Sequence, residues 1–281
     1  NNIKNAIFQY YIPILNFNNC NYIVVIHDVL FLDYKNLFSK SYIFIRQIIF
    51  GYSAKFSKSI FTVSNYSKNR ISHHFKINLN KILIAPNGVS EKFKNFDFPK
   101  IKSKDFIKKK YNLVNYSLFV GRFEKRKNQL LVINYIDSLP TKNIVFIGSK
   151  SNISVEVKRM ISSDERIYSF DNMQQTDLLH FYNAAELFVY PSEAEGFGIP
   201  PLEAGVLMTP VVCASNTALS DFKDLSFNMF NLKDVDSFTK NLKNFNKDKA
   251  ELSKIRTKII EKYDWSSAAK IIINHLNKIN I

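Results

Sequence analysis

A predicted strand, a glycine loop and a predicted helix follow one another in the segment Tyr190–Ala204, which reads YPSEAEGFGIPPLEA. Gly196 and Gly198 let the backbone approach a ligand closely, because they carry no side chain. Pro200 and Pro201 preset the first helical turn, so the positive end of the helix faces the crevice at the carboxyl edge of the sheet. Free amides at such a junction bind anions, and the segment therefore predicts a site for a pyrophosphate group.

Two glutamates of this segment lie eight residues apart, Glu195 before the turn and Glu203 in what we expect to be the first helical turn. One carboxylate is placed to address sugar hydroxyls and the other to address ribose hydroxyls. In the alternative interpretation, Glu203 only complements the helix dipole and Glu195 is a solvated loop residue. The neighbouring glycines and prolines favour the binding site.

The loop Gly121–Asn128 follows another predicted strand and is rich in basic residues. Arg122 offers a planar donor fork and Lys127 a point charge, and both suit the neutralisation of a diphosphate leaving group. Lys125 and Arg126 are expected to be solvated. A basic turn with no role is the alternative.

A third candidate is His27, which with Asp28 directly follows the predicted strand Tyr22–Ile26. This position is again the carboxyl end of a strand, where a crevice is expected. A lone histidine is more often structural. His27 gains a functional meaning only if the two series of strands described next face each other.

Short β-branched or aromatic runs alternate with helical patterns through most of the chain, which predicts a doubly wound α/β fold with buried parallel sheets. The expected strands form two series, at 22–26, 60–63 and 81–85, and at 117–120, 144–147, 166–170, 187–190 and 210–214. Between them, residues 90–115 are expected to form an interdomain linker with a basic helix. Three helices are expected from Val235 onward.

Composition limits the partners. The formal charge of +15 and a pI near 9.6 indicate an anionic partner, which can be nucleic acid, a membrane surface or a phosphorylated small molecule. Cys20 and Cys213 have no spacing suited to metal binding and fit a reducing compartment. No stretch approaches the ~20 apolar residues that cross a bilayer, and the first residues lack a secretory pattern. We expect a cytoplasmic protein.

Several motifs together resemble those of the GT-B-fold retaining glycosyltransferases of the large family called glycosyl transferases group 1. They run from about Tyr11 to Trp265 and read IHDVLF, FTVSNYS, APNGV, VGRFEKRKN, VFIGS and YPSEAEGFGIPPLEA…TPVV. The resemblance implies two Rossmann-like, doubly wound parallel-sheet domains. The expected parts are a partial acceptor-side domain at 1–98, a nucleotide-sugar-binding domain at 99–264, and a helix at 265–281 that crosses back to the first domain.

The same resemblance implies roles for the residues of the glycine loop. Glu195 contacts hydroxyls of the transferred sugar, and Glu203 holds the nucleotide ribose. Amides around Phe197, Gly198 and Ile199 help to bind phosphate.

The remaining implied roles concern the reaction. Gly121, Arg122 and Lys127 belong to the donor site, where the two basic residues stabilise the departing diphosphate. His27 comes from the acceptor-side domain and lies near the donor sugar. Retention proceeds without a metal or cofactor, by front-face attack in which the leaving phosphate oxygen takes the acceptor proton.

The chain departs from the family pattern in two places. Nothing before Tyr22 matches the strand, glycine-rich loop and further βα units with which relatives usually begin, so we expect a truncated acceptor domain. Met208 stands where many relatives have glycine just before Thr209-Pro210. This second departure is not expected to abolish function.

The expected function is transfer of a hexose, with mannose as the best guess, from a nucleoside-diphosphate sugar to a polysaccharide or glycolipid hydroxyl. The alternative is a truncated module that binds the nucleotide sugar without independent catalysis. A nucleic-acid-binding protein has only the charge in its favour, because no recognition motif is present. The regions Leu37–Phe61 and Lys100–Lys110 either rest on an anionic membrane at its inner face or are ordinary helices with a basic solvated face.

Overall fold

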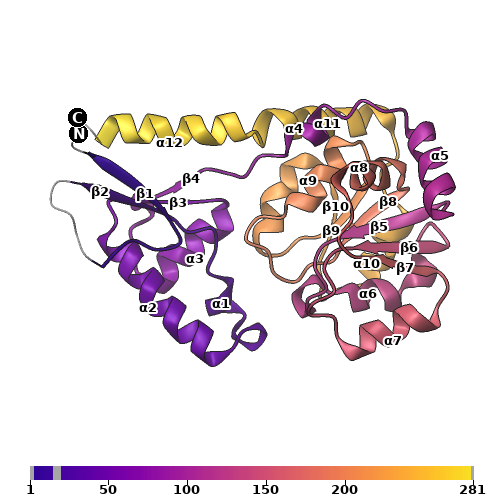
Figure 1. Ribbon diagram of the computed structural model, residues 1–281, viewed down its shortest axis with the longest axis horizontal. Helices are drawn as coiled ribbons and strands as arrows, with labels where there is room; N and C mark the ends of the chain where they lie inside the picture. The colour runs from indigo at the N-terminus through magenta and orange to yellow at the C-terminus, as the bar shows by residue number, and fades with distance from the viewer. Residues whose placement is uncertain (1–2, 15–19, 280–281) are drawn as a thin grey trace. The chain divides into compact units, whose positions relative to one another are not determined.

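The computed structural model describes residues 3–14 and 20–279, which form two compact units (Figure 1). Residues 1–2 of the expected first domain and residues 280–281 of the expected C-terminal helix lie outside the described residues, as do residues 15–19. The first unit comprises Asn1–Gly88, Ala194–Phe197 and Tyr263–Ile281, and the second comprises Val89–Glu193 and Gly198–Lys262.

A four-stranded parallel sheet forms the centre of the first unit, with its strands in sequence order. The strands are β1 (Asn5–Gln9), β2 (Asn21–Val25), β3 (Ser59–Thr62) and β4 (Ile82–Ile84). The helical segments are α1 (Leu30–Asp33), η1 (Lys35–Leu37), α2 (Lys40–Phe56), α3 (Asn65–Phe75), η2 (Leu79–Lys81) and α12 (Trp265–Ile279).

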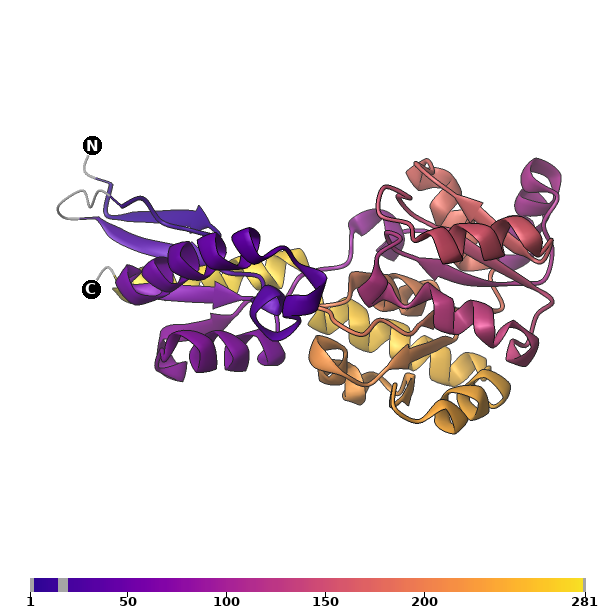
Figure 2. The ribbon, with the colours of Figure 1, turned by 90° about the horizontal axis from the view of Figure 1, so that it is seen from below.

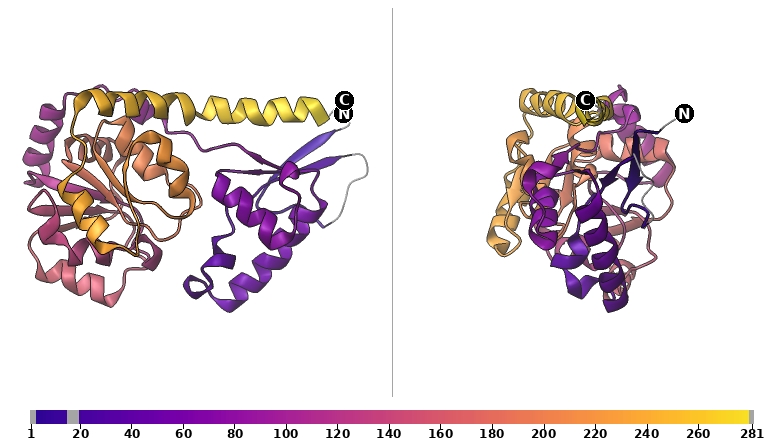
Figure 3. Two further views of the ribbon diagram at one scale, coloured as in Figure 1. Left: turned by 180° about the vertical axis from the view of Figure 1, so that it is seen from behind. Right: turned by 90° about the vertical axis from the view of Figure 1, so that its left-hand side faces the viewer.

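The two faces of this sheet pack against different helices, as Figures 1 and 3 show. Val24 and Ile60 are paired neighbours that point into a core shared with Phe50 of α2. Since side chains alternate along a strand, the next residue, Phe61, points the other way, where it meets His275 of α12 edge to face at 5.5 Å. α2 and α3 thus cover one face and α12 the other.

The second unit is built on a six-stranded parallel sheet in the order β10-β9-β8-β5-β6-β7. Its strands are β5 (Tyr116–Val120), β6 (Asn143–Ile147), β7 (Ile167–Phe170), β8 (Leu187–Tyr190), β9 (Val211–Ala214) and β10 (Asn228–Phe230). The order reverses between β5 and β8, which is the position where doubly wound sheets bind ligands.

Helices cover both faces of this sheet (Figures 1 and 3). The α-helices are α4 (Glu91–Lys94), α5 (Lys100–Tyr111), α6 (Gln129–Asn134), α7 (Val155–Ser163), α8 (Gln175–Ala184), α9 (Ile199–Val206), α10 (Val235–Lys243) and α11 (Lys249–Lys262). The 3-10 helices are η3 (Lys125–Lys127), η4 (Ile136–Ser138) and η5 (Thr217–Leu225). None of the helices within the described residues has both the length and the apolarity needed to span a bilayer.

The expected strands are all present, each within a residue or two of its predicted bounds. β1 and β10 were not anticipated. β1 has the sequence NAIFQ, with polar residues at both ends, and β10 is only the three residues NMF, so neither stands out before its neighbour in the sheet is known.

The structure corrects the prediction that residues 90–115 are a linker, because most of this stretch packs into the second unit. Lys100 donates from Nζ to the carbonyl oxygen of Ala185 at 2.7 Å, and Lys110 pairs with Asp177 at 2.7 Å. The N-terminal stretch of the first unit extends to Gly88, and Val89 begins the second unit. Lys100 and Lys110 of α5 thus hold the end and the start of α8 within the second unit.

α9 ends in a turn that places Met208 in the left-handed region, with φ of 57°. The Met208 N–H donates to the carbonyl oxygen of Gly205, and the Thr209 N–H donates to that of Ala204. This pair of bonds caps the last carbonyls of a helix and normally places glycine where Met208 stands. The left-handed backbone at position 208 therefore explains why many relatives have glycine there.

Replacing Met208 with glycine should stabilise the chain. Relief of the left-handed strain, ~1–2 kcal/mol, outweighs the extra freedom that glycine gives the unfolded chain. We expect a net gain of roughly 0.5–1 kcal/mol, visible as a higher melting temperature of the second unit. The matched control Ser162→Gly, on the exposed side of α7, should lower it. A lower melting temperature for Met208→Gly would contradict the strain argument.

Candidate functional site

Two loops meet at the carboxyl edge of the second sheet, where the strand order reverses. The carbonyl oxygen of Arg126, in the loop after β5, accepts from the Glu193 N–H at 2.6 Å and from the Ser192 hydroxyl at 3.2 Å, both in the loop after β8. Parallel strands deliver such loops to one edge, and these bonds join them there.

Lys127 is the buried cation of this edge, only 7% exposed. Its Nζ donates to the Tyr190 hydroxyl at 2.6 Å and lies 5.0 Å from the centre of the same ring. A buried ammonium needs polar partners and gains from an aromatic face. The contact fixes the lysine beside the end of β8, from which the glycine loop departs.

Arg122 is largely exposed, and Glu124 links it to Arg126. The Arg122 Nε lies 2.9 Å from one carboxylate oxygen of Glu124, and the Arg126 Nε lies 2.8 Å from the other. The Arg126 side chain is only 16% exposed, so the prediction that it is solvated was wrong, whereas Lys125 is exposed as expected. Gln129 donates from Nε2 to the Arg122 carbonyl oxygen at 2.9 Å and holds the loop in place.

Gly121 opens this loop against the end of β6. Its N–H donates to the carbonyl oxygen of Ile147 at 2.9 Å. Gly148 follows Ile147, and a Cβ added to it would lie 2.2 Å from the Gly121 carbonyl oxygen. The VFIGS motif therefore needs its glycine for the close approach of two loops.

The glycine loop enters α9 through Gly198, which has φ of 105°. A Cβ there would lie 2.5 Å from a methyl carbon of Leu219, so both space and backbone conformation demand glycine. Pro200 and Pro201 stand in the first helical turn and have no N–H. Anion binding at this helix start must therefore use amides before Pro200, which include that of Ile199.

Glu203 lies in the second turn of α9 and not in the first, because the helix begins at Ile199. Its carboxylate accepts from the Tyr182 hydroxyl at 2.8 Å. Burial raises the pKa of Glu203 to about 7, and the Tyr182 bond only partly opposes this. At that depth in the helix, Glu203 has little interaction with the helix dipole, so the alternative role as a dipole partner is not supported.

The segment Ala194–Phe197 belongs to the first unit. The Gly196 carbonyl oxygen accepts from the Ser64 hydroxyl at 2.8 Å and from the Ser67 hydroxyl at 3.2 Å. A Cβ on Gly196 would lie 2.5 Å from a carboxylate oxygen of Asp28. The buried Glu195 is thus carried by a segment held at the start of α3 and beside Asp28.

His27 lies two residues beyond the end of β2, next to Asp28. Its Nε2 is 3.4 Å from the Gln9 amide nitrogen, and its ring is 5.4 Å from that of Tyr10. Burial lowers the pKa of His27 more than the Asp28 charge raises it. The imidazole is therefore neutral at pH 7.

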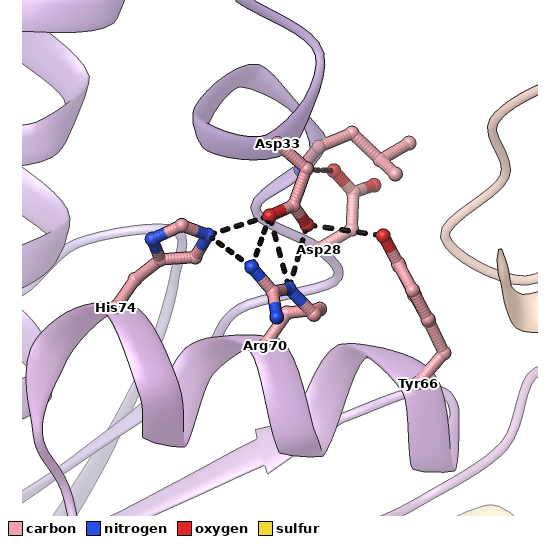
Figure 4. Close-up of polar contacts among 6 residues, drawn as sticks. Asp28, Asp33, Tyr66, Arg70 and His74 are labelled. Carbon is pink, nitrogen blue, oxygen red and sulfur yellow. Dashed lines mark hydrogen bonds and ion pairs between the residues drawn. The ribbon is translucent and has the colours of Figure 1, made fainter.

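An ion network fixes the backbone beyond His27-Asp28 (Figure 4). Asp33 of α1 accepts from Arg70 Nε at 2.9 Å, from His74 Nε2 at 2.7 Å and from the Tyr66 hydroxyl at 3.0 Å. Burial alone would raise the pKa of Asp33, but these bonds outweigh it and lower the pKa. α1 is thereby tied to α3, the helix whose start binds the Gly196 carbonyl.

The predicted site residues are distributed over both units. The second unit brings Gly121, Arg122 and Lys127 together in one loop at the β5–β8 edge, and it also holds Gly198, Ile199 and Glu203. The first unit holds His27, Glu195 and Phe197.

Sequence reasoning missed the side chains that position these residues: Glu124, Tyr182, Tyr190, Ser64 and Ser67. Tyr190 alone had a local signal, because it ends a strand just before the glycine loop. The other partners are either far away in the sequence or, like Glu124, resemble ordinary loop residues. Among the described residues, no cluster of three or more His, Cys, Asp or Glu side chains could hold a metal ion.

Two parallel-sheet units of this kind define the GT-B class of glycosyltransferases. Among solved structures, Anabaena Alr3699/HepE in complex with UDP-glucose superposes with a TM-score of 0.77 at 14% identity, over 92% of this chain and 72% of that one. A glycosyltransferase from Rickettsia africae gives a TM-score of 0.70 at 17% identity, over 93% and 71%. The expected α/β fold is confirmed.

The chain belongs to the family of glycosyl transferases group 1, whose sequence pattern matches residues 99–263. It is thus a glycosyltransferase, as the motifs indicated. It is 24% identical to the O-antigen chain mannosyltransferase RfbU of Salmonella typhimurium, over 94% of this chain and 70% of that protein. It is 28% identical to the O-antigen chain mannosyltransferase B of Escherichia coli, over 59% of this chain and 45% of that protein.

The raised pKa of Glu203 makes stability depend on pH. The folded chain holds a proton that the unfolded chain releases, so Glu203 costs stability as the pH rises from its ordinary pKa of 4.5 to about 7. Glu203→Gln removes this cost. We expect the free energy of unfolding of the variant, relative to that of the parent, to rise by roughly 2 kcal/mol from pH 5 to pH 8, a figure discounted for partial solvent access. Melting curves of both proteins at pH 5 and pH 8 check this. The same difference between the two proteins at both pH values would contradict it.

Proposed function

We propose that the chain transfers a hexose from a nucleoside-diphosphate sugar to a hydroxyl of a polysaccharide or glycolipid, with retention of configuration. The observation that carries the proposal is the β5–β8 edge, where a buried lysine, an exposed arginine and a glycine loop converge. Such an edge binds phosphate groups in doubly wound sheets. Mannose is the first candidate sugar, because the two O-antigen relatives are named mannosyltransferases.

In this proposal, Arg122 and Lys127 stabilise the charge on the departing diphosphate, which is the largest electrostatic need of the reaction. Amides of Phe197, Gly198 and Ile199 bind phosphate oxygens. No metal takes part, and the leaving oxygen accepts the proton of the attacking hydroxyl.

The two glutamates address the two ends of the donor. Glu203 accepts hydrogen bonds from ribose hydroxyls, and these donors favour its carboxylate form. Glu195 addresses hydroxyls of the sugar. His27, neutral at pH 7, acts near the reacting centre, and the enzyme works in the cytoplasm at the inner face of the membrane if its acceptor is lipid-linked.

Lys127→Met should reduce kcat/KM about 10²–10³-fold with a GDP- or UDP-hexose donor, because it removes a cation from the leaving group. Lys125→Met, two residues away on an exposed lysine, is the matched control and should keep activity within a factor of about two. Thermal-shift titrations with GDP, UDP and their sugars establish which nucleotide binds. Equal activity of the two variants would refute the role of Lys127. Stabilisation by nucleotide without any product would favour the binding module over the transferase.

His27→Ala should lower transfer about 10²-fold while leaving nucleotide affinity unchanged, because His27 is assigned to the reacting centre and not to the diphosphate. His73→Ala, which removes an exposed imidazole of α3, is the control for the loss of any histidine. Turnover and nucleotide titration on the same preparations separate the two effects. A His27 variant that loses nucleotide affinity but keeps its turnover rate would contradict the assignment.

A further inference from the structure

α2 exposes large apolar side chains on the face that it turns away from its own unit. Its inner face packs Phe50 into the core. On the outer face, Phe44 is 66% exposed, Ile45 54%, Ile48 57% and Phe56 58%. A solvated helix carries polar side chains at such positions. A contiguous exposed apolar patch marks an interaction surface.

These residues form one continuous surface. They recur at the three- and four-residue intervals of a single helical face. Tyr52 lies on the same face, with its ring 4.7 Å from that of Phe56, and its hydroxyl donates to the carbonyl oxygen of Ile14 at 3.0 Å. Ile14 is 82% exposed and extends the surface beyond the helix. We call this surface the α2 stripe; it consists of Ile14, Phe44, Ile45, Ile48, Ile49, Tyr52 and Phe56.

Figure 2 shows α2 on the viewer's side of the first sheet. None of the described elements of the first unit buries the stripe, as the exposed fractions show. The stripe lies on the face of the unit opposite to α12, whose His275 packs against Phe61 on the other side of the sheet.

The charge around the stripe is strongly positive. Residues 1–88 contain ten lysines and arginines and only two aspartates, which gives a formal charge of +8. Asp33 is engaged by Arg70, and Asp28 accepts from the Leu30 N–H at 3.1 Å. α2 itself contains no acidic residue. Lys40, Lys55 and Lys58 lie exposed on α2 or just beyond its end.

We propose that the α2 stripe docks on an anionic lipid bilayer. The aromatic and aliphatic side chains enter the boundary between headgroups and acyl chains, and Lys40, Lys55 and Lys58 meet the lipid phosphates. A second copy of this chain is a poorer partner, because two faces of the same high positive charge repel each other. The docking proposal rests on the α2 stripe and the charge around it. Only the role of docking, which is to bring the enzyme to a lipid-linked acceptor, rests on the proposed function.

Sedimentation of the full chain with vesicles tests the proposal. We expect binding to vesicles of phosphatidylcholine and phosphatidylglycerol in equal parts, weakened by salt, and little binding to phosphatidylcholine alone. The double variant Phe44→Ser with Ile48→Ser should lose most of the binding. The double variant Lys55→Glu with Lys58→Glu should bind anionic vesicles more weakly than the parent, by at least about fivefold for each lysine.

The control removes one exposed apolar side chain and one exposed lysine from the second unit. Val155 is 86% exposed on α7, and Lys158 is exposed on the same helix. Val155→Ser with Lys158→Glu should bind vesicles as the parent does. All substituted side chains are exposed, so melting temperatures should stay unchanged and would reveal any variant that fails to fold.

Failure of the parent chain to bind anionic vesicles would overturn the proposal. Equal losses in the α7 control would also overturn it, because binding would then follow overall charge and not the α2 stripe. A dimer that the α2 variants dissociate, without vesicle binding, would assign the surface to a second copy. A chain that binds a nucleotide sugar but no vesicles would leave the proposed function standing, and a chain that binds vesicles but no nucleotide would leave the docking surface standing.

Discussion

The hydrogen bond from the Lys127 amine to the Tyr190 hydroxyl joins the loop after β5 to the end of β8, at the place where the order of the second sheet reverses. The same two loops are also joined by the Arg126 carbonyl oxygen, which accepts from two donors in the loop after β8. Gly148 must lack a side chain because a third loop approaches from β6. Lys127 is therefore held in place by the protein itself, beside the end of β8.

The sequence was sufficient to predict the strands of both sheets and the glycine loop, because buried parallel strands and glycine turns leave strong local patterns. It was insufficient where an interaction joins distant segments. Arg126 was expected to be solvated because its pairing depends on how the loop folds around Glu124. The position of Glu203 was misjudged by one turn, since the helix start depends on the left-handed Gly198. The lysines of α5 suggested a linker because their partners, such as Asp177, lie more than sixty residues away.

Two carboxylates show how differently the chain treats negative charge. Asp33 is surrounded by Arg70, His74 and Tyr66, so it remains ionised although it is largely buried. The Tyr182 hydroxyl opposes the effect of burial on Glu203, but the pKa is still raised to about 7. The first arrangement is satisfied within the protein and serves the fold. The second keeps its proton because burial disfavours the charged form.

α9 is only eight residues long, and a residue of reversed backbone handedness stands just before it and another shortly after it, Gly198 and Met208. The helix can therefore neither lengthen nor slide along the chain, because each reversal is held by close packing or by hydrogen bonds. One residue added between positions 198 and 203 would turn the glutamate by about 100° around the helix axis and away from Tyr182. The distance between the glycine loop and the Glu203 carboxylate is thus fixed by the fold. An insertion or deletion in this stretch would displace the carboxylate, because neither end of α9 can shift to compensate.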